Sequence, residues 1–167
     1  MKTIFVAQRE QHAVLNDSST TSGAWKGNPN TRCTFKITDY CFRLGPKQIP
    51  PTRVRCQNYG YVEAFEALKV AFHCGGNTLA SMGILNATNY VVDKAEDLII
   101  SGLFVIGQDL ESYSGKSGSL LSGISTLGND LYFSANYTDM TVPALLDFFL
   151  HYDMKLVIDN GVLTVNV

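Results

Sequence analysis

Apolar and polar positions alternate along the last forty or so residues of the chain in the pattern of β-strands. Every second position from 131 to 137 is apolar, as in a strand with one buried face; these positions hold Leu131, Phe133, Ala135 and Tyr137. Residues 144–158 are almost continuously apolar and predict one long strand. Asn160-Gly161 favours the positive φ angles of a type I′ hairpin turn. Residues 162–167 are therefore expected to form a strand that closes a sheet.

The first half of the chain also shows strand patterns. Residues 2–8, in which Ile4 and Val6 alternate with Phe5 and Ala7, predict a strand that is buried on both faces. Farther on, two alternating apolar sets differ in parity: Cys33, Phe35 and Ile37, then Tyr40, Phe42 and Leu44. The change of parity predicts a β-bulge near Asp39.

Turn residues separate the next segments. Gly45-Pro46-Lys47-Gln48 predicts a turn, and Pro50-Pro51 excludes a central strand after it, because proline donates no ladder hydrogen bond. Residues 16–30 and 112–129, rich in Gly, Ser, Thr and Asn, predict two long loops.

Helical spacing occurs in one segment, residues 61–74. Val62, Phe65, Leu68 and Phe72 recur at the helical period, and Gly75-Gly76 supplies a stop. Residues 78–87 predict a weaker second helix, and residues 98–106 a following strand. The helices therefore form a short insert, at about residues 61–90, between strands.

Length and composition indicate a single domain, residues 1–167. Hydrophobic residues make up 46% of the 167 residues and charged residues 17%, which excludes a disordered chain. The net charge of -2 gives no electrostatic footprint for nucleic acid. No apolar run reaches the roughly 20 residues of a membrane span. The apolar part of the N-terminus is too short for a signal peptide, so we expect reduced thiols.

Several stretches invite a chemical interpretation. Gly115-Lys116-Ser117 resembles the end of a phosphate-binding loop, but position 110, where that motif needs glycine, is Leu110. Asp147, Asp153 and Asp159 share a parity that would place them on one face of the long C-terminal strand, as an exposed row.

Metal-binding and nucleophile patterns are missing from the sequence. The histidines, His12, His73 and His151, are widely spaced, and the four cysteines, Cys33, Cys41, Cys56 and Cys74, form no CxxC pair. No Gly-x-Ser-x-Gly elbow is present. We therefore expect no enzymatic activity, no cofactor and no metal.

Seven stretches in a fixed order resemble the C-terminal jelly roll of double-jelly-roll major capsid proteins from Polinton-type elements and adintovirus-like DNA viruses. They are Asn28-Pro29, Phe35-Lys36-Ile37, residues 45–50, the helix 61–74, residues 103–110, His151-Tyr152-Asp153 and Val157-Ile158-Asp159. His151 and Gln108 depart from the acidic and aromatic residues usual in that family. The family's N-terminal jelly roll is also missing, so this chain is either a fragment or a separately encoded single jelly roll.

The resemblance implies an antiparallel, mainly β jelly-roll sandwich with the helical insert. It also implies a structural capsid protein that self-assembles into trimeric capsomers of an icosahedral shell inside the host cell. Its partners would be identical copies, a second jelly roll or other capsid proteins.

Three residues are candidates for the interface between subunits. Trp25 is the only large apolar residue of the loop 16–30. Phe148 and Phe149 are consecutive, so a strand there must expose apolar side chains on both faces. One face would fill the core and the other needs cover.

Two other classes of protein remain open. A secreted or intracellular jelly roll that binds a ligand or carbohydrate would show an export signal, disulfides or aromatic residues gathered in one rim. A cupin-type enzyme would show a cluster of metal-binding histidines.

Overall fold

The structure is a computed structural model that describes most of the chain. The described residues are 1–10, 32–56, 61–74, 90–91, 101–102, 104–111, 123–126, 128–138, 140, 143–152, 155–159 and 162–166. The strands in them are β1 (Thr3–Glu10), β2 (Arg32–Cys33), β3 (Ile37–Leu44), β4 (Lys47–Arg55), β5 (Ser101–Gly102), β6 (Val105–Asp109), β7 (Leu131–Tyr137), β8 (Ala144–His151), β9 (Lys155–Asp159) and β10 (Val162–Asn166), and the helix is α2 (Val62–Cys74). The expected helix 78–87, the loop 16–30 and most of the loop 112–129 lie outside the described residues.

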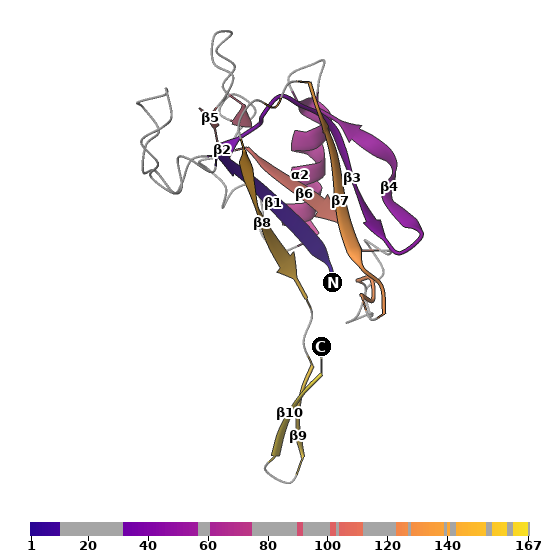
Figure 1. The fold of residues 1–167 in the computed structure, drawn as a ribbon. Helices are drawn as coiled ribbons and strands as arrows, with labels where there is room; N and C mark the ends of the chain where they lie inside the picture. Colours follow the sequence, from indigo (N-terminus) through magenta and orange to yellow (C-terminus); the bar gives the residue numbers. More distant parts are fainter. Residues whose placement is uncertain are drawn as a thin grey trace.

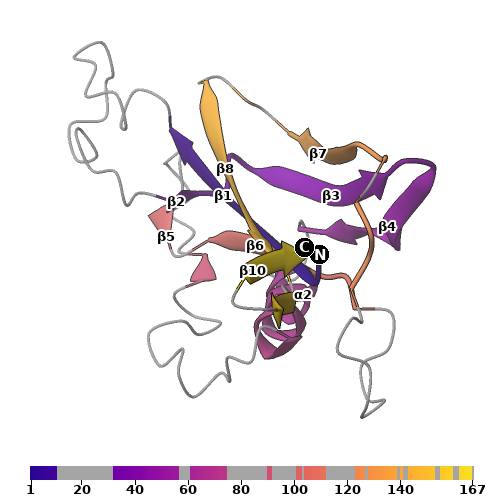
Figure 2. The same cartoon turned by 90° about the horizontal axis from the view of Figure 1, so that it is seen from below.

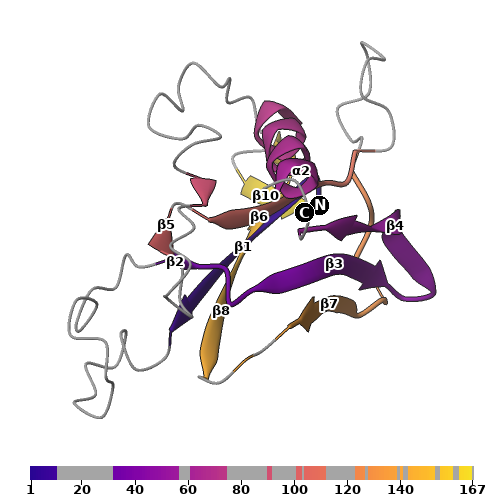
Figure 3. The ribbon, with the colours of Figure 1, turned by 90° about the horizontal axis from the view of Figure 1, so that it is seen from above.

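Two three-stranded antiparallel sheets form the body of the molecule (Figure 1). Their strand orders are β6-β1-β8 and β4-β3-β7. The views from below and from above show the two sheets as separate layers, with α2 beside β6 (Figures 2 and 3). The chain is therefore mainly β, with an arrangement compatible with a β-sandwich. Two further two-stranded sheets pair β2 with β5 and β9 with β10.

The N-terminal strand is buried on both faces, as its apolar pattern predicts. Ile4 and Val6 are fully buried in the core between the sheets. Phe5 points to the opposite face, where its ring lies 4.8 Å from that of Phe72 in α2. β1 is thus the central strand of its sheet and is covered by the second sheet and by the helix.

The bulge expected near Asp39 is confirmed, because the register of β3 against β7 shifts between Ile37 and Asp39. The strand expected before it is wrong. Phe35 and Lys36 have φ angles of 48° and 52°, and the backbone N–H of Ile37 donates to the carbonyl of Thr34 at 3.0 Å. A turn therefore separates β2 from β3.

The turn at Gly45 and the edge position of β4 are also confirmed. Gly45 has a φ of 56°, which glycine adopts without steric cost. β4 contains Pro50 and Pro51 and lies at the end of its sheet, where β3 is its one partner among the described strands.

The single long strand expected at residues 144–158 is wrong. The structure divides it into β8 and β9, because β8 pairs with β1 along the whole of β1, from Glu10 opposite Ala144 to Thr3 opposite His151. The next residue, Tyr152, belongs to no strand. β9 instead forms the expected hairpin with β10, in which Val162 lies opposite Asp159. These last two strands form a sheet of their own and do not close either of the larger sheets.

The helix predicted at residues 61–74 is confirmed, but its buried face is narrower than the apolar spacing suggests. Ala64, Leu68 and Ala71 are buried, whereas Val62 is 52% exposed. The strand expected at 98–106 is split into β5 and β6, and β6 extends to Asp109 because it pairs with β1.

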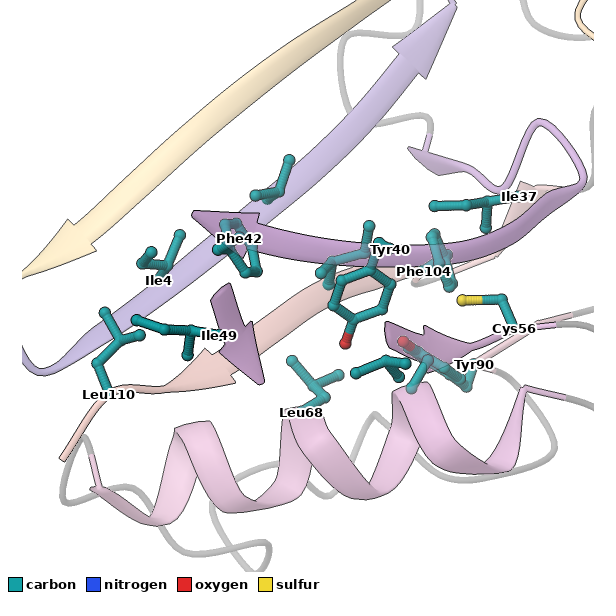
Figure 4. Packing of buried hydrophobic residues seen from close by; sticks show 14 of the residues in the cluster. Ile4, Ile37, Tyr40, Phe42, Ile49, Cys56, Leu68, Tyr90, Phe104 and Leu110 are labelled. Carbon is teal, nitrogen blue, oxygen red and sulfur yellow. The ribbon is translucent and has the colours of Figure 1, made fainter. Parts of the chain in front are cut away.

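Two buried tyrosines tie the core to β6 (Figure 4). The Tyr90 hydroxyl donates to the carbonyl of Val105 at 2.9 Å, and the Tyr40 hydroxyl donates to that of Gly107 at 3.5 Å. Burial raises the pKa of both phenols, so both stay protonated and able to donate. The core therefore supplies a backbone acceptor to each of these two hydroxyl groups.

Candidate functional site

The outermost strand of the first sheet, β8, carries a concentration of exposed apolar side chains. Those at least 36% exposed in and beside this strand are Leu146 (39%), Phe148 (45%), Phe149 (55%), Leu150 (40%) and Tyr152 (36%). Because β8 is last in the order β6-β1-β8, its outer edge pairs with no strand in the described part of the chain. β8 therefore combines apolar surface with an unpaired edge.

The register of β8 against β1 shows which way these side chains point. Phe148 and Leu150 lie opposite Val6 and Ile4, so they face the interior of the sandwich. Phe149 lies opposite Phe5 and faces the other way. Phe148 and Phe149, predicted together as interface residues, are thus exposed on opposite faces of one edge strand.

The second sheet covers the inward face of β8 only in part. β7 is the strand of that sheet nearest to β8, and the rings of Phe133 and Phe148 are 6.0 Å apart. The inward side chains of β7 are themselves only partly buried: Leu131, Phe133, Ala135 and Tyr137. We call this region, made of the inward side chains of β7 and β8, the open side of the sandwich.

The opposite side of the sandwich is closed by the helix. α2 packs along β6, where Leu68 and Ala71 lie close to Gly107. Figures 2 and 3 show α2 beside β6, on the side of the layers away from β7. The sandwich is therefore covered at one side and uncovered at the other.

One direct polar contact crosses the open side. The Tyr137 hydroxyl of β7 donates to Oε1 of Gln8 in β1 at 2.9 Å, and the Gln8 side chain is fully buried. Burial raises the pKa of the Tyr137 phenol to about 12, so this hydroxyl keeps its proton at neutral pH. The hydrogen bond joins the two sheets beneath the exposed apolar side chains.

Asp147, Asp153 and Asp159 were expected to share one face of a single long strand. This arrangement is not found, because the segment is divided into β8 and β9. Asp147 lies in β8, Asp159 lies in β9, and Asp153 is outside the described residues. Asp147 forms an ion pair with Arg9, with 2.5 Å between Oδ2 and Nε. The only carboxylate of β8 is thus paired with a cation on the neighbouring strand.

A second polar cluster lies on the outward face of the other sheet. Arg53 of β4 pairs with Asp39, and its guanidinium also donates to the Cys41 sulfur and to Ser134 Oγ, both at 3.1 Å. Burial raises the pKa of Asp39, but hydrogen bonds from Arg53, Thr38 and Asn136, with the Arg53 charge, bring it below its usual value. The cluster links β4, β3 and β7 side by side and stabilises the sheet.

Of the histidines and cysteines, the structure describes the side chains of His151, Cys41 and Cys56. His151 is exposed at the end of β8, whereas Cys41 and Cys56 are buried free thiols. Burial, with smaller effects of Asp39 and Glu63, raises the pKa of Cys56 to about 12, so the thiol is unreactive at neutral pH. Among the described residues, no three His, Cys, Asp or Glu side chains are placed to hold a metal ion.

Two further observations bear on the predicted partners. No helix in the described ranges has the length and apolar character needed to cross a membrane. Trp25, the third predicted interface residue, lies outside the described residues.

The apolar sequence pattern indicated part of this surface. Consecutive Phe148 and Phe149 showed that β8 must be apolar on both faces. The sequence pattern did not show that β7 would leave Phe148 half exposed, because the distance between β7 and β8 is set by the packing of the two sheets.

Comparisons of the chain with protein-family models, with curated proteins and with solved structures found no match.

Proposed function

We propose that this protein is a structural subunit of a self-assembling shell, of the kind that viral capsid proteins form, and that β8 is buried between subunits. The observation that carries the proposal is an edge strand that pairs with no strand on its outer side among the described residues and exposes apolar side chains on both faces. Soluble monomers seldom leave such a strand uncovered, because it can pair with other chains.

The two edge strands β4 and β8 differ in a way that supports this role. β4 carries Pro50, Pro51 and two arginines, devices that prevent pairing at a sheet edge. β8 has no proline, and the charge of its one carboxylate is balanced by Arg9. β4 is protected against association and β8 is not.

We propose further that the fold is a jelly roll, which the strand pairing supports. The early strand β1 pairs with the late strand β8, and β3 pairs with β7, the strand that precedes β8 in the sequence. Such nested pairing of early with late strands is what a jelly roll requires. In the proposed shell, the subunits associate as trimers through repeated copies of one contact.

The energy available from β8 suits a shell made of many modest contacts. Full burial of a phenylalanine side chain is worth about 1.5–3 kcal/mol. Phe148 and Phe149 are about half exposed, so covering each would add roughly half of that value. Symmetric repetition of such contacts produces a stable particle from weak pairs.

The proposal is tested by replacing Phe149 with aspartate in the full-length chain. Phe149 faces away from the core between the sheets, so we expect Phe149→Asp to keep the fold while it places a carboxylate in the contact. The control is Tyr132→Asp, which puts the same charge on another strand at a similarly exposed position (57%, compared with 55% for Phe149).

Mass photometry and negative-stain electron microscopy measure the assembly, and far-ultraviolet circular dichroism checks the fold. We expect trimers or larger particles for the wild type and for Tyr132→Asp, and at least a tenfold weaker association for Phe149→Asp. A wild-type protein that stays monomeric at high concentration contradicts the proposal. Equal assembly of the two variants contradicts the role of β8.

A further inference from the structure

The C-terminal hairpin, β9 with β10, lies apart from both larger sheets (Figure 1). Six of its ten strand residues are apolar. Its register places four of them together on one face of the hairpin: Leu156 opposite Val165, and Ile158 opposite Leu163. The alternate positions, from Lys155 to Asn166, are mostly polar or charged.

Such a hairpin needs a surface to cover it. A two-stranded hairpin by itself is at best marginally stable in water, and a third strand or a packed layer is required to stabilise it. The hairpin begins at Lys155, four residues after β8 ends at His151, yet it does not pair with the β8 of its own chain. Among the described strands, the hairpin therefore pairs with no other strand of its own chain.

The open side of the sandwich has the complementary features. The outer edge of β8 carries no strand among the described residues, and Phe148 and Leu150 beside it are 45% and 40% exposed. A hairpin added along this edge would continue the sheet β6-β1-β8. Its apolar face would then cover the inward side chains of β8 and β7.

We propose that the β9–β10 hairpin of one molecule adds to the open side of a second copy of this chain. The inference deepens the proposed function, on which it rests, by naming the segment that covers β8. The backbone pairing is β-strand addition, and each copy supplies one donor hairpin and one acceptor edge. Reciprocal exchange closes a dimer, and head-to-tail donation closes a ring, as in a trimer.

A pair of neighbouring substitutions in β9 tests the donor. Ile158→Asp places a carboxylate on the apolar face, and the control Val157→Asp places it on the more polar face one residue away. We expect at least a tenfold weaker association for Ile158→Asp and no change for Val157→Asp, measured by mass photometry on the full-length chain. Equal losses in the two variants would overturn the inference.

A mixing experiment tests whether the contact is between molecules. Leu150→Asp damages the acceptor edge and leaves the hairpin intact, whereas Ile158→Asp damages the donor and leaves the edge intact. We expect each variant alone to be monomeric and the mixture to form a heterodimer, detected by native mass spectrometry. A mixture that stays monomeric would overturn the exchange between molecules.

The proposed function and the hairpin inference can fail separately. If Ile158→Asp assembles like the wild type and Phe149→Asp does not, the hairpin inference is overturned and the role of β8 stands. If the wild type is monomeric, both are overturned. Circular dichroism confirms that each variant is folded, and Leu146→Asp, at another exposed inward position of β8 (39%), replaces Leu150→Asp if that variant does not fold.

Discussion

The seating of the helix on β6 depends on the absence of a side chain at Gly107, and Gly107→Ala tests this dependence. A Cβ atom at this position would lie 2.7 Å from Leu68 Cδ1 and 3.1 Å from both Ala71 Cβ and the Leu68 Cα. The Leu68 methyl can rotate away, but the helix backbone at Cα cannot yield without moving α2. The added methyl group should therefore push the helix off the sheet.

The cost follows from the general effect of overpacking. Inserting one methyl group into a packed core destabilises by about 1–3 kcal/mol. For a chain of this length each kcal/mol lowers Tm by about 2–4 °C, so we expect a fall of about 2–12 °C. Urea unfolding followed by circular dichroism measures the free energy of unfolding directly. The control Val70→Ala, at a site 50% exposed on the same helix, should change it by less than about 0.5 kcal/mol.

A double variant identifies the clash as the cause. Leu68→Ala alone leaves a cavity and should cost about 2–5 kcal/mol. In the double variant the methyl group added at position 107 occupies part of that cavity, so the combined cost should be smaller than the sum by at least about 0.5 kcal/mol. Gly107→Ala with wild-type stability, or strictly additive costs, would refute the account of how α2 is seated.

Three other substitutions test the contacts between strands. Tyr137→Phe should lower the free energy of unfolding by about 1–3 kcal/mol, measured in urea, because buried Gln8 loses the hydroxyl that donates to it. Asp39→Asn should lower the free energy of unfolding at pH 7, and the difference in this free energy from the wild type should shrink below about pH 4. Burial raises the pKa of Asp39, but Arg53 and its other partners lower it more, so the pKa is depressed in the folded state. The stabilisation by the charged carboxylate is therefore lost as pH falls. Wild-type stability should fall as pH rises above about 8.5, where the unfolded thiol of Cys56 loses its proton while its folded pKa is about 12. Cys56→Ala should flatten this decline between about pH 8.5 and 10, before tyrosines ionise. An equally steep decline in Cys56→Ala would assign the alkaline effect to other groups.

Local signals in the sequence determined the identity of several elements. Alternation of apolar residues located β1 and β7, helical spacing located α2, and Asn160-Gly161 located the β9–β10 hairpin. Pro50 and Pro51 placed β4 at an edge, because two consecutive prolines remove an N–H donor on each side of the strand, whereas a central strand needs donors on both sides. Each of these signals acts within a few residues, so no knowledge of the partner is needed to interpret it.

Other features depend on partners that are far apart in the sequence. The apolar run 144–158 predicted one strand, yet β8 ends at His151, opposite Thr3, where its ladder with β1 also ends. The same dependence decides which faces are covered. Val62 fits the helical spacing but is exposed, because α2 packs against the core through the face that carries Ala64, Leu68 and Ala71.

The candidate site shows the same division. The sequence by itself determined that Phe148 and Phe149 must point to opposite faces of a strand, because side chains alternate along any strand. Only the tertiary structure decided that both faces would be half exposed, since that depends on β7 and β8 being the last strands of their sheets while α2 covers the other side. Alternation is a property of the backbone of one strand, whereas exposure is set by the packing of segments more than a hundred residues apart, such as β1 and β8.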